Sequence, residues 1–454
     1  MLWTELHRRG CSGPIIDWLR SLYENMRYIV RSNGETSDDF ESAVGVLIGD
    51  PSSPTLWNLY LADFDPPAHP DNPMLGTTRV NDLVHADDGV LLSLSPHGLQ
   101  AHLTYLFTYA GRKQLLTNAL KTYLIIFNVL PTRAFALYLG DKALTYVCEV
   151  TYVGIPLKSD TQNICTSLYD KIKTKSTRAS WAITGMENVL KDLPPAVARL
   201  LYTARIDALP CAGADVVPDM DDGVKELEKI QISFLQRTLG LSGHSMHTPP
   251  FTELKLMPLR HWRATLALRY LRYAIEQPPG HLVHAALEEQ MALFGTIHSC
   301  WLGDLAHALK RIPAVEPIQM PSPAMLRRPG TVDGLIDRID KALRAQLLAD
   351  VKESPRLYLM RDRLKPQKRG PPKKALMQFR HYLGLRDKDD RKAFVRLLAS
   401  EHPLPSGKIA TLPLAQQQDI QKGQSRKAAV SLLRYCRRVF GARSPHVRAP
   451  RYSA

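Results

Sequence analysis

Cysteine is scarce and scattered in this 454-residue sequence: its six cysteines lie far apart, and none forms a Cys-x-x-Cys pair. Such spacing excludes a dense disulfide framework and favours a reducing, intracellular compartment, either the nucleus or the cytoplasm. Long hydrophobic runs are also missing. No stretch approaches about 18 consecutive apolar residues, and the opening MLWTELHRRG has no apolar core of signal-peptide length. The sequence therefore predicts neither a secreted nor a membrane-spanning protein.

Acidic residues are fewer than basic ones, with 44 Asp and Glu against 59 Lys and Arg, which leaves a net charge of +15. The usual reason for such an excess is a polyanionic partner, and nucleic acid ranks ahead of a membrane surface. A basic protein without such a partner is the alternative that charge alone leaves open. The hydrophobic share, 44%, is ordinary for a chain that builds packed cores.

The order of turn and apolar patterns predicts an α+β segment followed by a helical one. Asn33-Gly34 between RYIVRS and ETSDDF is a strong hairpin signal, and a second hairpin is predicted at Gly140-Asp141. After YVGIPL the apolar spacing becomes helical. Proline becomes frequent after about residue 312, and the stretch PRLYLMRDRLKPQKRGPPKK is expected to be poorly ordered in isolation. We predict four parts, which are an α+β segment over 1–157, helices over 158–312, a Pro-rich basic linker over 313–375 and a basic helical segment over 376–454.

Asp87 and Asp88 form an acidic tip between two short apolar strands, LVHA and GVLLS. Nucleotidyl transfer by a polymerase uses two Mg²⁺ ions about 3.5–4 Å apart, held by carboxylates. A hairpin tip suits this task because its turn residues project together, instead of alternating between sheet faces. This pattern makes Asp87 and Asp88 candidate catalytic and metal-binding residues.

The pair alone is weak evidence, since adjacent aspartates also occur at Asp38-Asp39, Asp221-Asp222 and Asp389-Asp390. The order of the surrounding motifs is more specific. The Asn33-Gly34 hairpin, the segment GDPSSPTLWNLYLADF, the acidic tip, a helix, a predicted strand with Asn118 and Lys121-Thr122, and YVGIPL follow one another along the chain. In this order they resemble the reverse transcriptases of non-LTR (LINE-like) retrotransposons of the fungal type, over residues 1 to about 275.

The resemblance implies a role for each motif. It implies that the acidic tip binds metal, that a turn and helix form the floor under template and nucleotide, that a lysine lies near the triphosphate, and that a strand grips the primer. The corresponding residues are Asp87 and Asp88 for the metal, Gly49, Asp50, Pro51, Ser53, Pro54 and Asn58 for the floor, Lys121 near Asn118 and Thr122 for the triphosphate, and Tyr152 and Gly154 for the primer. For all but the acidic tip, packing or turn chemistry is an equal alternative.

The resemblance also implies a fold, a cofactor and partners. The fold is a partial polymerase palm, made of an antiparallel sheet with packed helices, then an all-helical thumb and a basic extension. The cofactor is Mg²⁺, with Mn²⁺ as a substitute, and the partners are an RNA template and a DNA primer. No membrane and no small-molecule cofactor are expected.

The sequence departs from the family in ways that bear on activity. No strand of the form F-x-D-x-x-x-A-F-D, which holds the family's first metal-binding aspartate, precedes the segment that begins at Met1, and neither Asp63 nor Asp65 replaces it. His85 stands where the family usually has an aromatic residue, and Leu47-Ile48 stands where it has Arg-Gln. We therefore expect an N-terminally truncated chain with little or no polymerase activity of its own, because one carboxylate pair supplies too few ligands for two ions.

Two other interpretations remain open. One is a non-catalytic nucleic-acid-binding remnant of a retrotransposon, and the other is an unrelated helical interaction protein with a coincidental Asp-Asp turn. Near the end of the chain, Cys436 and His446 lack partners at zinc-ligand spacing, so a basic tail without metal is the stronger prediction there.

Overall fold

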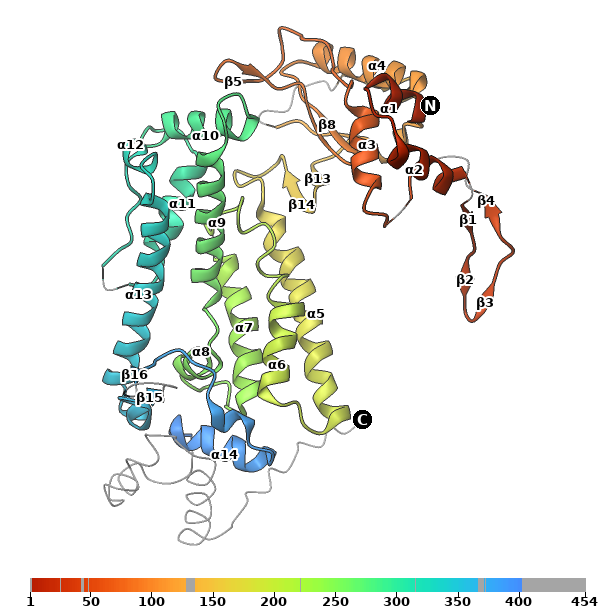
Figure 1. Cartoon of the computed structure of the whole chain (residues 1–454). Helices are drawn as coiled ribbons and strands as arrows, with labels where there is room; N and C mark the ends of the chain where they lie inside the picture. The colour runs from red at the N-terminus through yellow and green to blue at the C-terminus, as the bar shows by residue number, and fades with distance from the viewer. Residues whose placement is uncertain are drawn as a thin grey trace, which may run out of the picture. The chain divides into compact units, whose positions relative to one another are not determined.

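A computed structural model describes residues 2–24, 26–41, 45–47, 49–127, 135–220, 222–314, 316–365, 371 and 373–401 (Figure 1). The chain forms two compact units, residues 1–165 and 166–454. Each is described by itself. Within the described ranges, no helix combines the length and the apolar character needed to cross a membrane.

Unit 1 combines short helices with small strand pairs. Leu6, Leu19 and Leu56 come from three different helices and form one of its buried clusters. A second cluster is centred on Leu103 and Leu139. The helices of unit 1 are α1 (Leu2–Arg8), α2 (Pro14–Glu24), α3 (Ser53–Leu61), α4 (Pro96–Arg112) and the 3-10 turn η1 (Ala119–Lys121).

The strands of unit 1 are short and mostly pair as hairpins. One pair is parallel and consists of β9 (Tyr123–Leu124) and β12 (Thr145–Tyr146). The antiparallel pairs are β1 (Arg27–Tyr28) with β4 (Phe40–Glu41), β2 (Arg31–Ser32) with β3 (Glu35–Thr36), β5 (Met74–Leu75) with β6 (Thr78–Arg79), β7 (Asp82–His85) with β8 (Asp88–Leu91), β10 (Tyr138–Leu139) with β11 (Lys142–Ala143), and β13 (Glu149–Tyr152) with β14 (Ile155–Lys158). The described part of unit 1 therefore contains small two-stranded sheets, all antiparallel except one, which is compatible with the antiparallel sheet and packed helices that we expected.

Local turn chemistry explains several of these hairpins. Asn33 and Gly34 both have positive φ, 51° and 88°, as the tight turn between β2 and β3 requires. The hairpin predicted at Gly140-Asp141 is also present. The strand predicted at Asn118–Thr122 is not: the Asn118 side chain accepts a hydrogen bond from the Leu120 backbone N–H and starts the 3-10 turn η1, so the strand begins only at Tyr123.

Unit 2 is built almost entirely of helices in its described part. Its helices are α5 (Thr166–Leu190), α6 (Pro195–Leu201), the π-turn η2 (Tyr202–Ile206), α7 (Gly223–Leu239), α8 (Thr248–Leu254), α9 (Leu259–Glu276), α10 (Leu282–Leu293), α11 (Trp301–Lys310), α12 (Pro323–Leu326), α13 (Thr331–Glu353), the 3-10 turns η3 (Pro355–Met360) and η4 (His381–Gly384), and α14 (Lys388–Leu398). One strand pair, β15 (Leu364–Lys365) with β16 (Lys373–Lys374), accompanies them.

The linker expected over 313–375 differs from the structure, because α13 runs through the middle of it. Leu335 and Ile339 on this helix belong to one buried cluster of unit 2, and Leu343 and Leu347 belong to the other. These residues recur every three to four positions, so α13 presents one apolar stripe to both clusters. We predicted a linker here because the segment is rich in proline, and the apolar stripe of α13 was not recognised.

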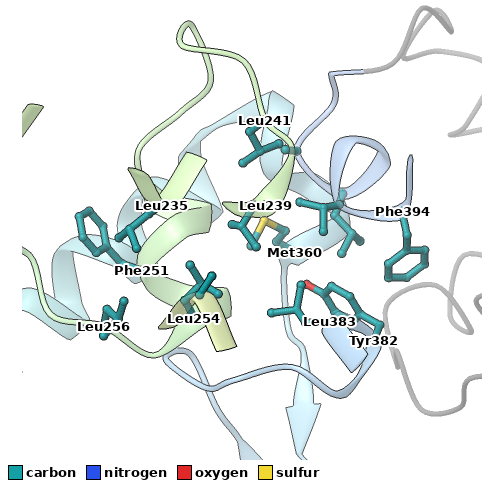
Figure 2. Close-up of a cluster of buried hydrophobic side chains, with 14 of the residues drawn as sticks. Leu235, Leu239, Leu241, Phe251, Leu254, Leu256, Met360, Tyr382, Leu383 and Phe394 are labelled. Atoms are coloured by element: carbon teal, nitrogen blue, oxygen red, sulfur yellow. The ribbon is translucent and has the colours of Figure 1, made fainter. Parts of the chain in front are cut away.

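The described residues after 375, which are 376–401, pack into unit 2. Tyr382, Leu383 and Phe394 pack among Leu235, Leu239 and their neighbours (Figure 2). A buried ion cluster adds to this contact. The Glu253 carboxylate on α8 lies 2.8 Å from Arg363 Nη1 and 3.7 Å from Arg380 Nε, and it accepts a hydrogen bond from the Tyr382 hydroxyl. Cys436 and His446 lie outside the described residues.

Candidate active site on an acidic hairpin

The turn between β7 and β8 presents two adjacent carboxylates to solvent. His85 pairs with Asp88, so Ala86 and Asp87 are the two residues of the turn. Ala86 adopts a positive φ of 55°, which the first position of a tight hairpin turn demands. Both Asp87 and Asp88 are exposed, and neither forms an ion pair with another described residue. The predicted position at a hairpin tip is therefore what the structure shows.

Helix α3 contacts this turn directly. The indole Nε1 of Trp57 donates a 2.7 Å hydrogen bond to the backbone carbonyl oxygen of Ala86. Asn58, the next residue on α3, is exposed. This contact holds α3 against the base of the acidic tip. Helix α3 is the one that the resemblance associates with template and nucleotide. No prediction had singled out Trp57.

The turn before α3 is held by its own polar side chains. Gly49 has a φ of 87°, a conformation open to glycine at little cost. The Asp50 carboxylate accepts hydrogen bonds from the backbone N–H of Ser52, at 2.6 Å, and from its hydroxyl, at 2.8 Å. Pro51 lies in the turn and Pro54 lies in the first turn of the helix, where a missing N–H costs nothing.

Ser53 is buried, and its hydroxyl lies 3.2 Å from the hydroxyl of Tyr23 on α2. The same Tyr23 oxygen accepts a hydrogen bond from the backbone N–H of Leu47 at 3.3 Å. Tyr23 therefore anchors both sides of the turn, a role that sequence reasoning missed. The only signal for this role in the sequence was the hydroxyl group of Tyr23 on an otherwise apolar side of α2.

The β13–β14 hairpin contacts strand β7 of the acidic hairpin. The Tyr152 hydroxyl donates a 3.2 Å hydrogen bond to the backbone carbonyl oxygen of Leu83 on β7. Burial raises the pKa of Tyr152, and the carboxylates of Asp88 and Asp82 raise it further, so the phenol stays protonated and remains a donor. Val153 and Gly154 form the turn with φ of 46° and 82°. A β-branched residue is uncommon in this conformation and marks local strain.

Lys121 is exposed on η1. Ala119, two residues earlier, packs against the same buried cluster as Leu91 at the end of β8. Lys121 therefore belongs to the same unit as the acidic tip, but no hydrogen bond or ion pair among the described residues joins it to Asp87 or Asp88.

Two nearby carboxylates have other roles. Asp63 on the segment after α3 accepts a 2.7 Å hydrogen bond from the Tyr109 hydroxyl and lies 2.9 Å from Lys113 Nζ. Burial acts to raise the pKa of Asp63, but these two partners overcome it and lower the pKa to about 2. Asp82, at the start of β7, has a pKa raised by burial and by the charge of Asp65. Asp63 is thus committed to an internal ion cluster.

The donors at the tip are hard carboxylate oxygens, which suit Mg²⁺ and Mn²⁺ better than soft metals. The exposed position of Asp87 and Asp88 leaves their oxygens accessible. Within the described residues, no three His, Cys, Asp or Glu side chains gather closely enough to hold a metal ion by themselves.

Comparison with known families gives one match. Residues 1–157 match the family model described as reverse transcriptase (RNA-dependent DNA polymerase). This segment is similar to reverse transcriptases, and we call it the reverse-transcriptase segment. The match spans the acidic tip, the α3 turn and the β13–β14 hairpin of the reverse-transcriptase segment, and it does not extend into unit 2. No curated protein matches the chain.

Proposed function

We propose that the reverse-transcriptase segment is part of an RNA-directed DNA polymerase palm of the non-LTR retrotransposon type, and that Asp87 and Asp88 are its metal-binding carboxylates. One observation carries the proposal: the acidic hairpin formed by β7 and β8 receives hydrogen bonds from two other motifs that the resemblance identifies. Trp57 of α3 binds one end of the turn, and Tyr152 binds strand β7 behind it. A chance Asp-Asp turn has no reason to be held between these two segments.

The chain's own residues would position the metal and the substrates. Asp87 and Asp88 would hold Mg²⁺, which supplies Lewis-acid stabilisation of the charge that develops during nucleotidyl transfer. The rigid turn from Gly49 to Pro54 would present the exposed Asn58 face of α3 to template and incoming nucleotide. The β13–β14 turn at Gly154 would lie against the primer strand, with Tyr152 fixing its distance from β7.

Iron-mediated cleavage tests the metal site. With added hydrogen peroxide and ascorbate, Fe²⁺ bound in place of Mg²⁺ reduces the peroxide to hydroxyl radicals that cut the backbone nearby, and ascorbate regenerates the Fe²⁺. We therefore expect fragments ending near the Ala86 turn, suppressed by excess Mg²⁺. The double variant Asp87→Asn/Asp88→Asn should lose these fragments. The matched control is Asp38→Asn/Asp39→Asn, an exposed pair in the same unit, which should cleave like the unaltered chain. Equal cleavage in both double variants would refute the metal site.

We propose further that the chain alone extends a primer poorly, because two carboxylates are fewer than the three that fix two Mg²⁺ ions in this chemistry. A primer-extension assay on an RNA template, with Mg²⁺ or Mn²⁺, should give product close to the level of Asp87→Asn/Asp88→Asn. Robust cDNA synthesis that depends on the two aspartates would contradict the weak activity while supporting the metal site.

A non-catalytic nucleic-acid-binding protein is the second candidate. It is favoured by the net charge of +15 and by the large helical unit outside the matched segment. Salt-sensitive binding to a primer–template duplex, together with an absence of aspartate-dependent metal cleavage, would select this candidate over the polymerase.

A further inference from the structure

A hollow of about 540 Å³ on unit 2 is lined chiefly by basic side chains. It lies where the ends of α5 and α7 meet the start of α14. Five cations line it together with one carboxylate, Glu187, and the lining residues in the described part include no aromatic ring. The cations are Lys191, Arg237, Lys388, Lys392 and Arg396. We call this surface the basic groove.

Internal pairing uses only part of this positive charge. The Glu187 carboxylate lies 3.1 Å from Lys392 Nζ, 3.4 Å from Lys388 Nζ and 3.4 Å from Arg237 Nε. Burial acts to raise the pKa of Glu187, but Lys392 and Lys388 overcome this and lower it, so the carboxylate is ionised. One negative charge is thus shared by three cations.

Helix ends account for two further contacts. Lys388 Nζ donates to the backbone carbonyl of Lys191 at 2.6 Å, and Arg396 Nε donates to that of Gly240 at 2.7 Å. Cations at helix C-termini are stabilised by the exposed carbonyls. This structural role explains one N–H of each side chain.

The groove includes exposed cations. Arg237 is half exposed, and Lys191 is exposed with no side-chain ion pair to any described residue. The acidic first turn of α14 does not neutralise them, since Asp387 caps the backbone N–H of Asp390 and neither residue lines the groove. The groove therefore holds an uncompensated cluster of N–H donors.

The groove is also a built feature of the fold. Gly240 has a φ of 72°, and a Cβ there would meet the Lys392 side chain at 2.5 Å from Cγ. The absence of a side chain at Gly240 lets the stem of Lys392 lie directly on the backbone, which directs its ammonium group along the groove floor. Arg396 is fixed on the same glycine through its carbonyl.

We propose that the basic groove binds the phosphodiester backbone of a nucleic-acid strand. Clustered Lys and Arg donors recognise phosphate oxygens, and the absence of an aromatic platform among the lining residues favours backbone contact over base stacking. The groove is open to solvent, instead of closed around a small anion. The inference stands on unit 2 alone and does not require Asp87 or Asp88 to bind metal.

Fluorescence anisotropy with a labelled single-stranded DNA of roughly 20 nucleotides tests the proposal on the full chain. The variant Lys191→Gln/Arg237→Gln/Lys388→Gln removes three cations and keeps the Lys392–Glu187 pair. Its affinity should fall about tenfold at roughly 0.1 M salt, and the slope of log affinity against log salt should shrink by about 2, since each single-strand phosphate contact contributes about 0.7.

The matched control removes three cations elsewhere on unit 2, with the same change in total charge: Lys225→Gln/Arg272→Gln/Arg344→Gln. Each of these residues pairs with a surface carboxylate away from the groove. The control should bind with an unchanged salt slope. Equal losses in the two triple variants would overturn the proposal, because binding would then follow total charge alone.

Lysine acetylation on the unaltered chain keeps the test independent of variant folding. Bound DNA should reduce the acetylation of Lys191 and Lys388 severalfold relative to Lys225. Unchanged reactivity would refute the groove as a strand-binding site. Protection by tripolyphosphate without protection by DNA would also overturn the proposal, and would assign the groove to a free polyphosphate.

Discussion

Trp57 and Ala86 are 29 positions apart, yet the indole N–H of the first donates to the backbone carbonyl of the second at 2.7 Å. The acceptor is the first residue of the acidic turn, and Ala86 there has a positive φ of 55°. The helix thus holds the turn in a conformation that its own sequence favours only weakly. The orientation of Asp87 depends on this contact.

The variant Trp57→Phe keeps an aromatic ring and removes the donor. A hydrogen bond contributes about 1 kcal/mol net, so we expect amide hydrogen exchange at residues 86–89 to accelerate about fivefold. Exchange in unit 2 should not change. Trp18→Phe, at an exposed ring on α2, serves as the control and should leave the turn amides as they are; unaltered turn protection in Trp57→Phe would contradict the prediction.

Removing the Glu253 carboxylate should destabilise unit 2 strongly. Glu253 is 1% exposed, and its loss leaves the buried guanidinium groups of Arg363 and Arg380 without a counter-charge. Burial already lowers the pKa of Arg380 to about 10, with Glu253 acting in the opposite direction. We expect Glu253→Ala to cost about 3–5 kcal/mol in urea unfolding.

The exposed Glu353 at the end of α13 provides the comparison. Glu353→Ala should change the free energy of unfolding by less than about 0.5 kcal/mol. Similar losses in the two variants would show that the ion cluster around Glu253 contributes nothing beyond an ordinary surface charge.

His261 should make the stability of unit 2 depend on pH. Burial, with a smaller effect from the charge of Arg260, lowers the pKa of His261 to about 4. An unfolded histidine takes up a proton near pH 6.5, so between these values the unfolded chain binds more protons than the folded one. The free energy of unfolding therefore falls as the pH drops from about 6.5 to about 4, by roughly 2–3 kcal/mol from this residue.

His261→Phe removes the titrating group and keeps a ring of similar shape. Urea unfolding at several pH values should give the variant a shallower loss of stability over the same window. His298→Phe, at an exposed position, should follow the unaltered chain. Parallel curves for the unaltered chain and His261→Phe would rule out His261 as the cause.

Gly240→Ala should destabilise the contact between α7 and α14. An alanine at a φ of 72° is strained by about 1–2 kcal/mol, and its Cβ would displace the stem of Lys392. Gly243→Ala places a methyl group where no atom lies within 4 Å and where φ is not positive. Chemical denaturation should therefore separate the two variants by at least about 1 kcal/mol, and indistinguishable midpoints would contradict this account.

The sequence was most informative where a few neighbouring residues decide the conformation. The hairpins at Asn33-Gly34 and at Asp87 follow from turn preferences that act over two to four residues. The strand expected at Asn118 from the motif order is absent for a local reason too, because the Asn118 side chain starts a 3-10 turn there. The helix α13 was missed because proline-rich flanks outweighed its apolar stripe.

The amino-acid sequence by itself determined the basic charge, the acidic turn and the order of motifs in the reverse-transcriptase segment, since these depend on composition and on local backbone preferences. Only the tertiary structure decided that Trp57 and Tyr152 hold this turn, and that Lys191, Arg237 and Lys388 share one groove. These groups lie far apart along the chain, and packing alone brings them together. No local pattern encodes such a distance.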